Sequence, residues 1–74
     1  MIGKSHIGEQ LRQRRKTLRV TQRQLADYAG LSINTVYQIE RGQANPTLET
    51  LLALADTLGL EFSLRAKRLY RAGG

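Results

Sequence analysis

Apolar side chains recur every three or four residues along most of residues 1–59, which predicts a bundle of helices. A first helix is expected over roughly residues 5–18, because Ile7, Leu11, Arg15 and Leu18 share one helical face. A strongly apolar helix is expected after Thr47 to close the core from the other side and to end at Gly59. Its inward positions are expected to be Leu48, Leu51, Leu52, Leu54, Ala55 and Leu58.

Residues 21–40 are typical of two shorter helices joined by a turn. Thr21 and Ser32 each precede an apolar-periodic run, where a hydroxyl can cap free backbone N–H groups. Gly30 is expected to end the first of these helices in a left-handed conformation. In the second helix, Val36 and Ile39 form the expected buried pair.

The outward face of that second helix is uncharged. It carries Ile33, Asn34, Thr35 and Gln38, where Lys and Glu would be ordinary for a solvated helix surface. Amide side chains can donate and accept together at adenine, and an aliphatic side chain can cover a thymine methyl group. The face therefore predicts contact with base edges in a major groove, and the alternative is a polar helix face with no partner.

A buried ion pair is expected between the first helix and the end of this second helix. Arg15 faces inward in the predicted packing and needs a carboxylate, and Glu40 is the natural candidate. The alternative is two independent surface charges. The loop that follows has Gly42 ending one helix and Thr47 capping the next.

From Leu60 the apolar period changes to two, which predicts a half-buried strand over residues 60–67. Because the chain offers this strand no partner, we expect it to pair with the same strand of a second copy. A helix that continues through this segment is the competing interpretation. Residues 68–74 are expected to form a basic flexible tail. The inward positions of the strand, expected to mediate dimerisation, are Leu60, Phe62, Leu64 and Ala66.

Charge and composition narrow the function. The 74 residues carry a net charge of +6, distributed as +6 over residues 1–23, −4 over 24–64 and +4 over 65–74. The basic ends suggest a polyanionic partner, although basic residues can also serve solubility alone. Without Cys and with one His, the chain offers no metal site, cofactor site or catalytic constellation, so it is not expected to be an enzyme. The four aromatic residues form no stacking platform, which disfavours RNA.

No membrane segment or signal peptide is expected. The longest strongly apolar run, residues 51–55, is far too short to span a bilayer. A soluble cytoplasmic protein is therefore predicted. Its predicted fold class is all-α, a compact four- to five-helix bundle with a central helix-turn-helix and a C-terminal strand that pairs with a second subunit. Residues 1–59 would form the helical domain, 60–67 the dimerisation strand and 68–74 the tail.

The span from Ile7 to Gly59 resembles the Cro/C1-type (Xre) helix-turn-helix repressors, through TQRQLADYAGLSINTVYQIERG and the NPTLETLLALADTLGL that follows. The resemblance implies that Ser32 to Arg41 is a recognition helix and that Arg15 and Glu40 form an internal salt bridge. Ile33 departs from the polar residue frequent at its position, so base preference does not transfer. Base contacts are expected from Ser32, Ile33, Asn34, Thr35 and Gln38. Contacts to the DNA backbone are expected from Thr21, Gln22, Arg23, Tyr37, Arg41, Gln43 and Asn45.

The continuation LEFSLRAK is similar to a narrower group, the HipB-type antitoxins of toxin-antitoxin modules. This resemblance implies a HipA-like toxin kinase as partner and repression of the chain's own operon. The predicted function is thus a dimeric, sequence-specific repressor on an inverted-repeat operator, which is also an antitoxin. The alternative is a stand-alone prophage-type Cro/C1 repressor without a toxin.

Overall fold

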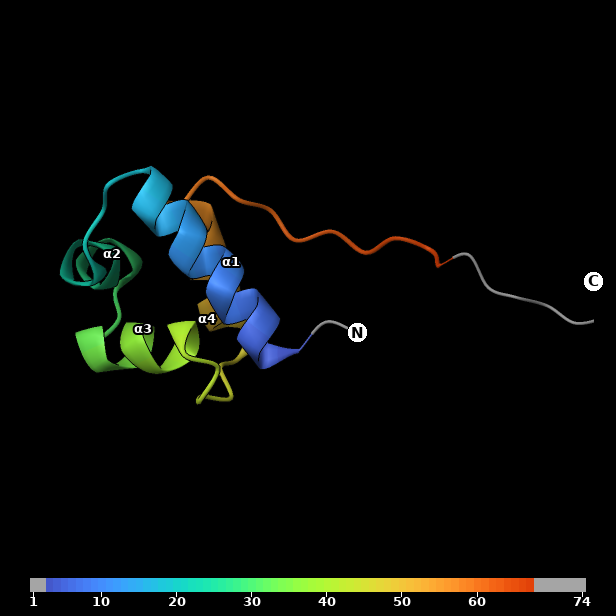
Figure 1. The fold of residues 1–74 in the computed structure, drawn as a ribbon, viewed down its shortest axis with the longest axis horizontal. Coiled ribbons are helices and arrows are strands. Elements are labelled where there is room, and N and C mark those ends of the chain that lie inside the picture. The colour runs from blue at the N-terminus through green and yellow to red at the C-terminus, as the bar shows by residue number, and fades with distance from the viewer. Residues whose placement is uncertain (1–2, 68–74) are drawn as a thin grey trace, which may run out of the picture.

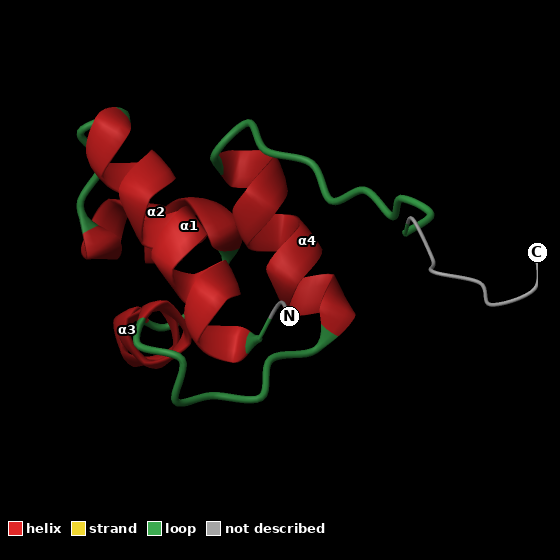
Figure 2. Cartoon of the chain, turned by 45° about the vertical axis from the view of Figure 1, so that its right-hand side comes forward, coloured by secondary structure: helices red, strands yellow, loops and turns green. Residues whose placement is uncertain are grey.

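The structure, a computed structural model, describes residues 3–67 as four helices joined by short loops. They are α1 (Lys4–Thr17), α2 (Gln22–Ala29), α3 (Ile33–Glu40) and α4 (Leu48–Thr57). Both α1 and α2 pack on α3, and α4 packs against α2 (Figures 1 and 2). The all-α fold class is confirmed, with four helices in the described residues.

Local capping signals set the helix starts. Thr21 accepts a hydrogen bond from the Gln24 backbone N–H at 3.0 Å, and the Gln24 side chain accepts one from the Thr21 N–H at 2.9 Å. This reciprocal pair is a capping box. Gly30 ends α2 with φ at 72°, a conformation in which a side chain would be strained. The predicted end of α2 at Gly30 and the predicted start of α3 after Ser32 are therefore confirmed.

One close contact fixes the distance between α1 and α3. Gly8 lies buried in the middle of α1, and a Cβ atom there would come within 2.3 Å of the Ile39 carbonyl oxygen. It would also come within 2.9 Å of the Glu40 carbonyl oxygen. Only glycine lets the backbone of α1 approach the last turn of α3 this closely. The glycine costs some helix propensity but brings the two helices into direct contact.

The core joins all four helices, but the face of α4 that is buried is narrower than the sequence predicted. Leu48 is 66% exposed and Leu52 is 47% exposed, and Leu18 at the end of α1 is 42% exposed. These positions share the helical period of the core, but no element in the described chain covers them. The buried apolar residues are Leu11, Leu25, Ala26, Val36, Ile39, Leu54, Ala55 and Leu58.

Residues 60–67 form neither a strand nor a helix in the structure. The segment leaves the end of α4 and extends away from the bundle (Figure 1). A strand needs a second strand for its backbone hydrogen bonds, and the described single chain supplies none. The continuing helix is also not formed, because α4 ends at Thr57. Leu60 packs against the chain's own core, whereas Leu64 is fully exposed. The tail predicted over 68–74 lies outside the described residues.

Candidate nucleic-acid interface

Helix α3 has one face built into the core and one face open to solvent. Val36, Ile39 and Glu40 are buried against the neighbouring helices. On the opposite side, Asn34 is exposed and Ile33 is 42% exposed, while Thr35 and Gln38 are half-buried. Since α1 and α2 both pack on the buried side, the open face is held by a rigid support.

The polar groups of the open face are not equally free to bind a ligand. The Ser32 hydroxyl accepts from the Thr35 backbone N–H at 3.1 Å and lies 2.8 Å from the Thr35 hydroxyl, so both residues are engaged in capping. In the part of the chain that the structure describes, the amides of Asn34 and Gln38 have no hydrogen-bond partner. These two amides are the groups best placed for base edges.

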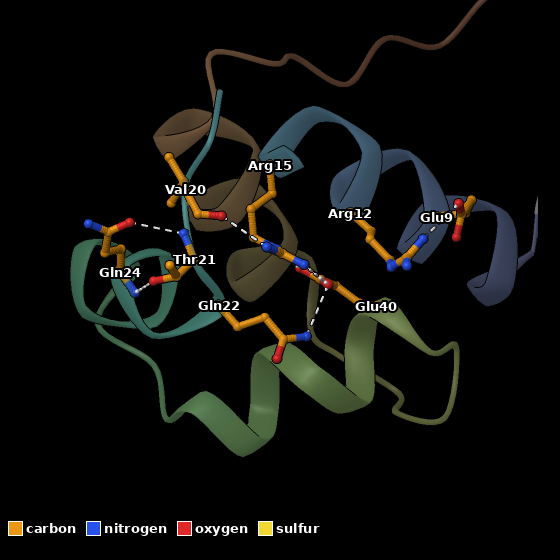
Figure 3. Close-up of polar contacts among 8 residues, drawn as sticks. All are labelled: Glu9, Arg12, Arg15, Val20, Thr21, Gln22, Gln24 and Glu40. Atoms are coloured by element: carbon orange, nitrogen blue, oxygen red, sulfur yellow. Dashed lines mark hydrogen bonds and ion pairs between the residues drawn. The ribbon is translucent and has the colours of Figure 1, made fainter. Parts of the chain in front are cut away.

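A buried polar network ties the end of α3 to the other helices (Figure 3). Arg15 donates from Nε to Glu40 Oε2 at 2.7 Å and from Nη2 to Glu40 Oε1 at 3.0 Å, which is the bidentate pair expected from the sequence. Its Nη1 donates to the Val20 carbonyl at 2.9 Å, just before α2 begins. Among the described residues, no buried side-chain nitrogen or oxygen lacks a partner. The network therefore fixes the C-terminal end of α3, and its hydrogen bonds offset the cost of burying two charges.

Gln22, expected to face the DNA backbone, points instead toward this network. Its Nε2 donates to Glu40 Oε1 at 3.2 Å, and the residue is half-buried (Figure 3). The backbone N–H groups of Gln22 and Arg23 donate no capping hydrogen bond among the described residues and remain free at the start of α2. An anion at this end of the helix would be bound mainly by those N–H groups and by the exposed Arg23.

The loop after α3 forms a second polar edge. The Arg41 guanidinium carbon lies 5.1 Å from the centre of the Tyr37 ring, a cation–π contact between two exposed side chains. Gln43 and Asn45 are exposed as well. Asn45 Oδ1 accepts a hydrogen bond at 2.9 Å from Lys4 Nζ, at the start of α1. The structure thus places the predicted backbone-contacting residues Arg41, Gln43 and Asn45 just beyond the C-terminal end of α3.

Two features of this surface are absent from the sequence predictions. Neither the Gln22–Glu40 bond nor the proximity of Lys4 to Asn45 follows from periodicity, because both join residues far apart in the chain. Gly8, within the predicted first helix, is the one local signal, since a glycine inside a helix suggests a close helix contact. Nothing in the sequence says which element makes that contact.

Between residues 3 and 67 there is no group of three His, Asp or Glu side chains able to hold a metal ion. None of the four helices combines the length and apolar character that a membrane crossing requires.

Comparison with known proteins points in the same direction. Residues 11–64 match the family described as helix-turn-helix. The chain is 48% identical over 52 residues to the HTH-type transcriptional regulator DicA of Escherichia coli, covering 70% of this chain and 38% of that protein. It is 42% identical over 57 residues to the immunity repressor protein of Bacillus phage phi105, covering 77% of this chain and 40% of that protein. The chain thus spans well under half the length of either relative.

A similar fold is found in a solved structure. The restriction-modification controller protein C.AhdI from Aeromonas hydrophila superposes with a TM-score of 0.75 at 36% sequence identity. The match covers 78% of this chain and 88% of the controller protein. None of these three proteins is named as a HipB protein or as an antitoxin.

Proposed function

The chain belongs to the Cro/C1-type (Xre) helix-turn-helix family of DNA-binding transcriptional regulators, and from this premise we propose that it represses transcription at a specific operator. The family is one of regulators and not of enzymes, as the sequence predicts. The observation that carries the proposal is the open face of α3, where two unpartnered amides and Ile33 stand on a helix fixed by the buried Arg15–Glu40 pair.

In the proposed mechanism, α3 enters the major groove and Asn34 and Gln38 contact base edges. Ile33 supplies apolar contact to a thymine methyl group, and Ser32 and Thr35 flank these contacts. Backbone contacts come from the start of α2 and from the loop after α3, and these hold the helix in register without reading sequence. The proposed backbone-contacting residues are Thr21, Arg23, Tyr37, Arg41, Gln43 and Asn45, together with Gln22 through its backbone N–H.

We further propose that the repressor acts as a homodimer on an inverted repeat, with half-sites about one helical turn apart. The exposed Phe62 and Leu64 in the extended segment after α4 support an interface there. Leu60 takes little part in that interface, because it packs on its own core. A second copy would also add burial to a small domain. The cytoplasm, where the DNA lies, is the proposed location.

The stand-alone repressor is the better supported of the two functions predicted from sequence. Its support comes from the likeness to a phage immunity repressor and to a restriction-modification controller. The antitoxin function, which includes a HipA-like kinase as its partner, rests on the alternating segment LEFSLRAK alone. Co-purification of the chain with the product of the neighbouring gene would favour the antitoxin, whereas a plain repressor should purify without it.

Binding to the DNA upstream of the chain's own gene, compared with a scrambled duplex of equal length, tests the main proposal. Asn34→Ala and Gln38→Ala should each cost about 1–3 kcal/mol on the upstream duplex and little on the scrambled one. Arg41→Ala should weaken both and reduce the salt slope by about one unit per lost phosphate contact. Fluorescence anisotropy over a salt series measures all three.

A matched control is Gln13→Ala, which removes an exposed amide of α1 that bonds to Glu9 at 2.8 Å. It should change neither affinity. If Asn34→Ala weakens both duplexes equally, the assignment of α3 as the recognition helix is wrong.

A further inference from the structure

We propose that Lys4, at the start of α1, is an additional contact to the DNA backbone and that Asn45 positions it there. The inference deepens the function proposed above and rests on it. Lys4 lies outside every residue set predicted from the motif, and it is 41 positions from Asn45 in the chain. Only the fold brings its ammonium group to the edge of the candidate interface.

The start of α1 is held tightly against the loop that follows α3. Lys4 Nζ donates to Asn45 Oδ1 at 2.9 Å. One residue on, Ser5 packs so closely on Gly42 that a Cβ atom at position 42 would lie 2.6 Å from the Ser5 hydroxyl and 2.8 Å from its Cα. A side-chain bond and a backbone contact therefore place Lys4 beside the loop, and the position does not depend on one flexible side chain.

This location is where a phosphate should pass. Helix α3 has 8 residues, so its length is about 12 Å, close to the width of the major groove. Groups just beyond each end of such a helix come near the sugar-phosphate walls of the groove. Arg41 and Asn45 lie beyond the C-terminal end of α3, and the bond to Asn45 adds the Lys4 charge to that edge.

The charge of Lys4 is not neutralised by a carboxylate, unlike those of Arg12 and Arg15 on the same helix. Arg12 is paired with Glu9 at 3.4 Å, Arg15 is paired with Glu40, and Arg14 donates to the Leu58 carbonyl at 2.8 Å. The acceptor of Lys4 is a neutral amide oxygen, so the bond orients the ammonium group without neutralising it. Two of its three donors remain for a phosphate, and the Asn45 NH₂ group can donate beside them.

The test compares Lys4→Gln with Lys67→Gln in the full chain. The probes are a duplex enriched from a random library by the wild-type chain and a scrambled duplex. Lys4→Gln should weaken binding to both, and its slope of log K against log salt should be shallower by about 0.9. The loss of affinity should then be about 3.5-fold larger at 50 mM than at 200 mM salt, because a slope difference of about 0.9 acts over a fourfold change in salt concentration. Lys4→Arg should keep the wild-type slope.

Lys67→Gln is the matched control, since it removes the same charge from an exposed site in the segment that leads away from the helices. Its slope should match wild type. An unchanged slope for Lys4→Gln, or an equal loss for Lys67→Gln, would overturn the proposed contact. Unfolding in urea separates an effect on stability from an effect on DNA contact. If Lys4 were only structural, Lys4→Gln would lower the free energy of unfolding and leave the salt slope unchanged.

A double-mutant cycle tests the positioning by Asn45. Asn45→Ala should cost less affinity in the Lys4→Gln background than in the wild-type chain, whereas equal costs would show that Asn45 acts independently. Failure of the DNA-binding proposal gives a different result. In that case Asn34→Ala would weaken both duplexes equally, whatever the slope measured for Lys4→Gln.

Discussion

At the residue scale, the pair of Arg15 and Glu40 does the most to hold the interface. Both side chains are buried, with 11% and 2% of their surfaces exposed, so solvent screens them little. A buried pair of this kind need not stabilise the fold more than apolar residues would. Removing one partner is a different matter, because the other is left as a buried charge with no counter-ion.

Glu40→Ala should therefore lower the free energy of unfolding by about 3–5 kcal/mol, a large part of what a domain of this size has. Urea denaturation followed by circular dichroism measures the loss. Glu9→Ala is the control, since its pair with Arg12 is exposed and should be worth less than about 1 kcal/mol. The double variant Arg15→Met and Glu40→Leu should recover most of the stability. Its failure to do so would mean that the charges themselves are required.

At the scale of the element, two helices begin with the same device. Ser32 accepts from the Thr35 N–H and Thr47 accepts from the Thr50 N–H, both at 3.1 Å. In each case the capping hydroxyl also bonds to the hydroxyl three residues on, at 2.8 Å in α3 and 3.0 Å in α4. The caps are chemically equivalent, but only α3 carries the proposed base contacts.

Ser32→Ala and Thr47→Ala should each lower the free energy of unfolding by about 1 kcal/mol, because each frees one backbone N–H at a helix start. Only Ser32→Ala should also weaken binding to the enriched duplex, since it loosens the first turn of α3 beside Ile33 and Asn34. Chemical denaturation and fluorescence anisotropy on the same preparations separate the two effects. Equal losses of affinity would indicate that α4 contributes to binding as much as α3.

At the scale of the whole molecule, two groups of exposed apolar side chains bear on assembly. Leu48 and Leu52 lie on the outer face of α4, and Phe62 and Leu64 lie in the segment that follows it. Scattered apolar residues on a surface are common, but a small domain gains stability by covering them. Our proposal assigns the dimer interface to the segment after α4, where strands from two copies can pair.

Leu64→Glu should convert the dimer to a monomer, since it places two like charges in the paired strands. It should not disturb the monomer fold, because Leu64 is fully exposed there. Leu48→Glu is the control, as the same change on an exposed leucine of α4, and should leave the dimer intact. Analytical ultracentrifugation over a concentration series shows whether each variant is a dimer or a monomer. If Leu48→Glu dissociated the dimer and Leu64→Glu did not, the interface would lie on α4 and the proposed strand pairing after α4 would be wrong.

The sequence by itself determined the helices and their limits. Caps such as Thr21 and stops such as Gly30 act within one or two turns, so neighbouring residues contain the whole signal. The apolar period likewise identified the buried side of α3 and the inward direction of Arg15, because a helix face follows from spacing alone. A buried arginine then requires a carboxylate, and this made Glu40 predictable.

Only the tertiary structure decided which surfaces meet. Periodicity marks a residue as apolar-facing but not whether another element covers it, so Leu48 and Leu52 could not be separated from the true core of α4. The inward turn of Gln22 and the approach of Lys4 to Asn45 depend on distances between helices, which no local pattern encodes. Those distances are set by packing, here by a glycine at position 8 that brings two backbones into contact.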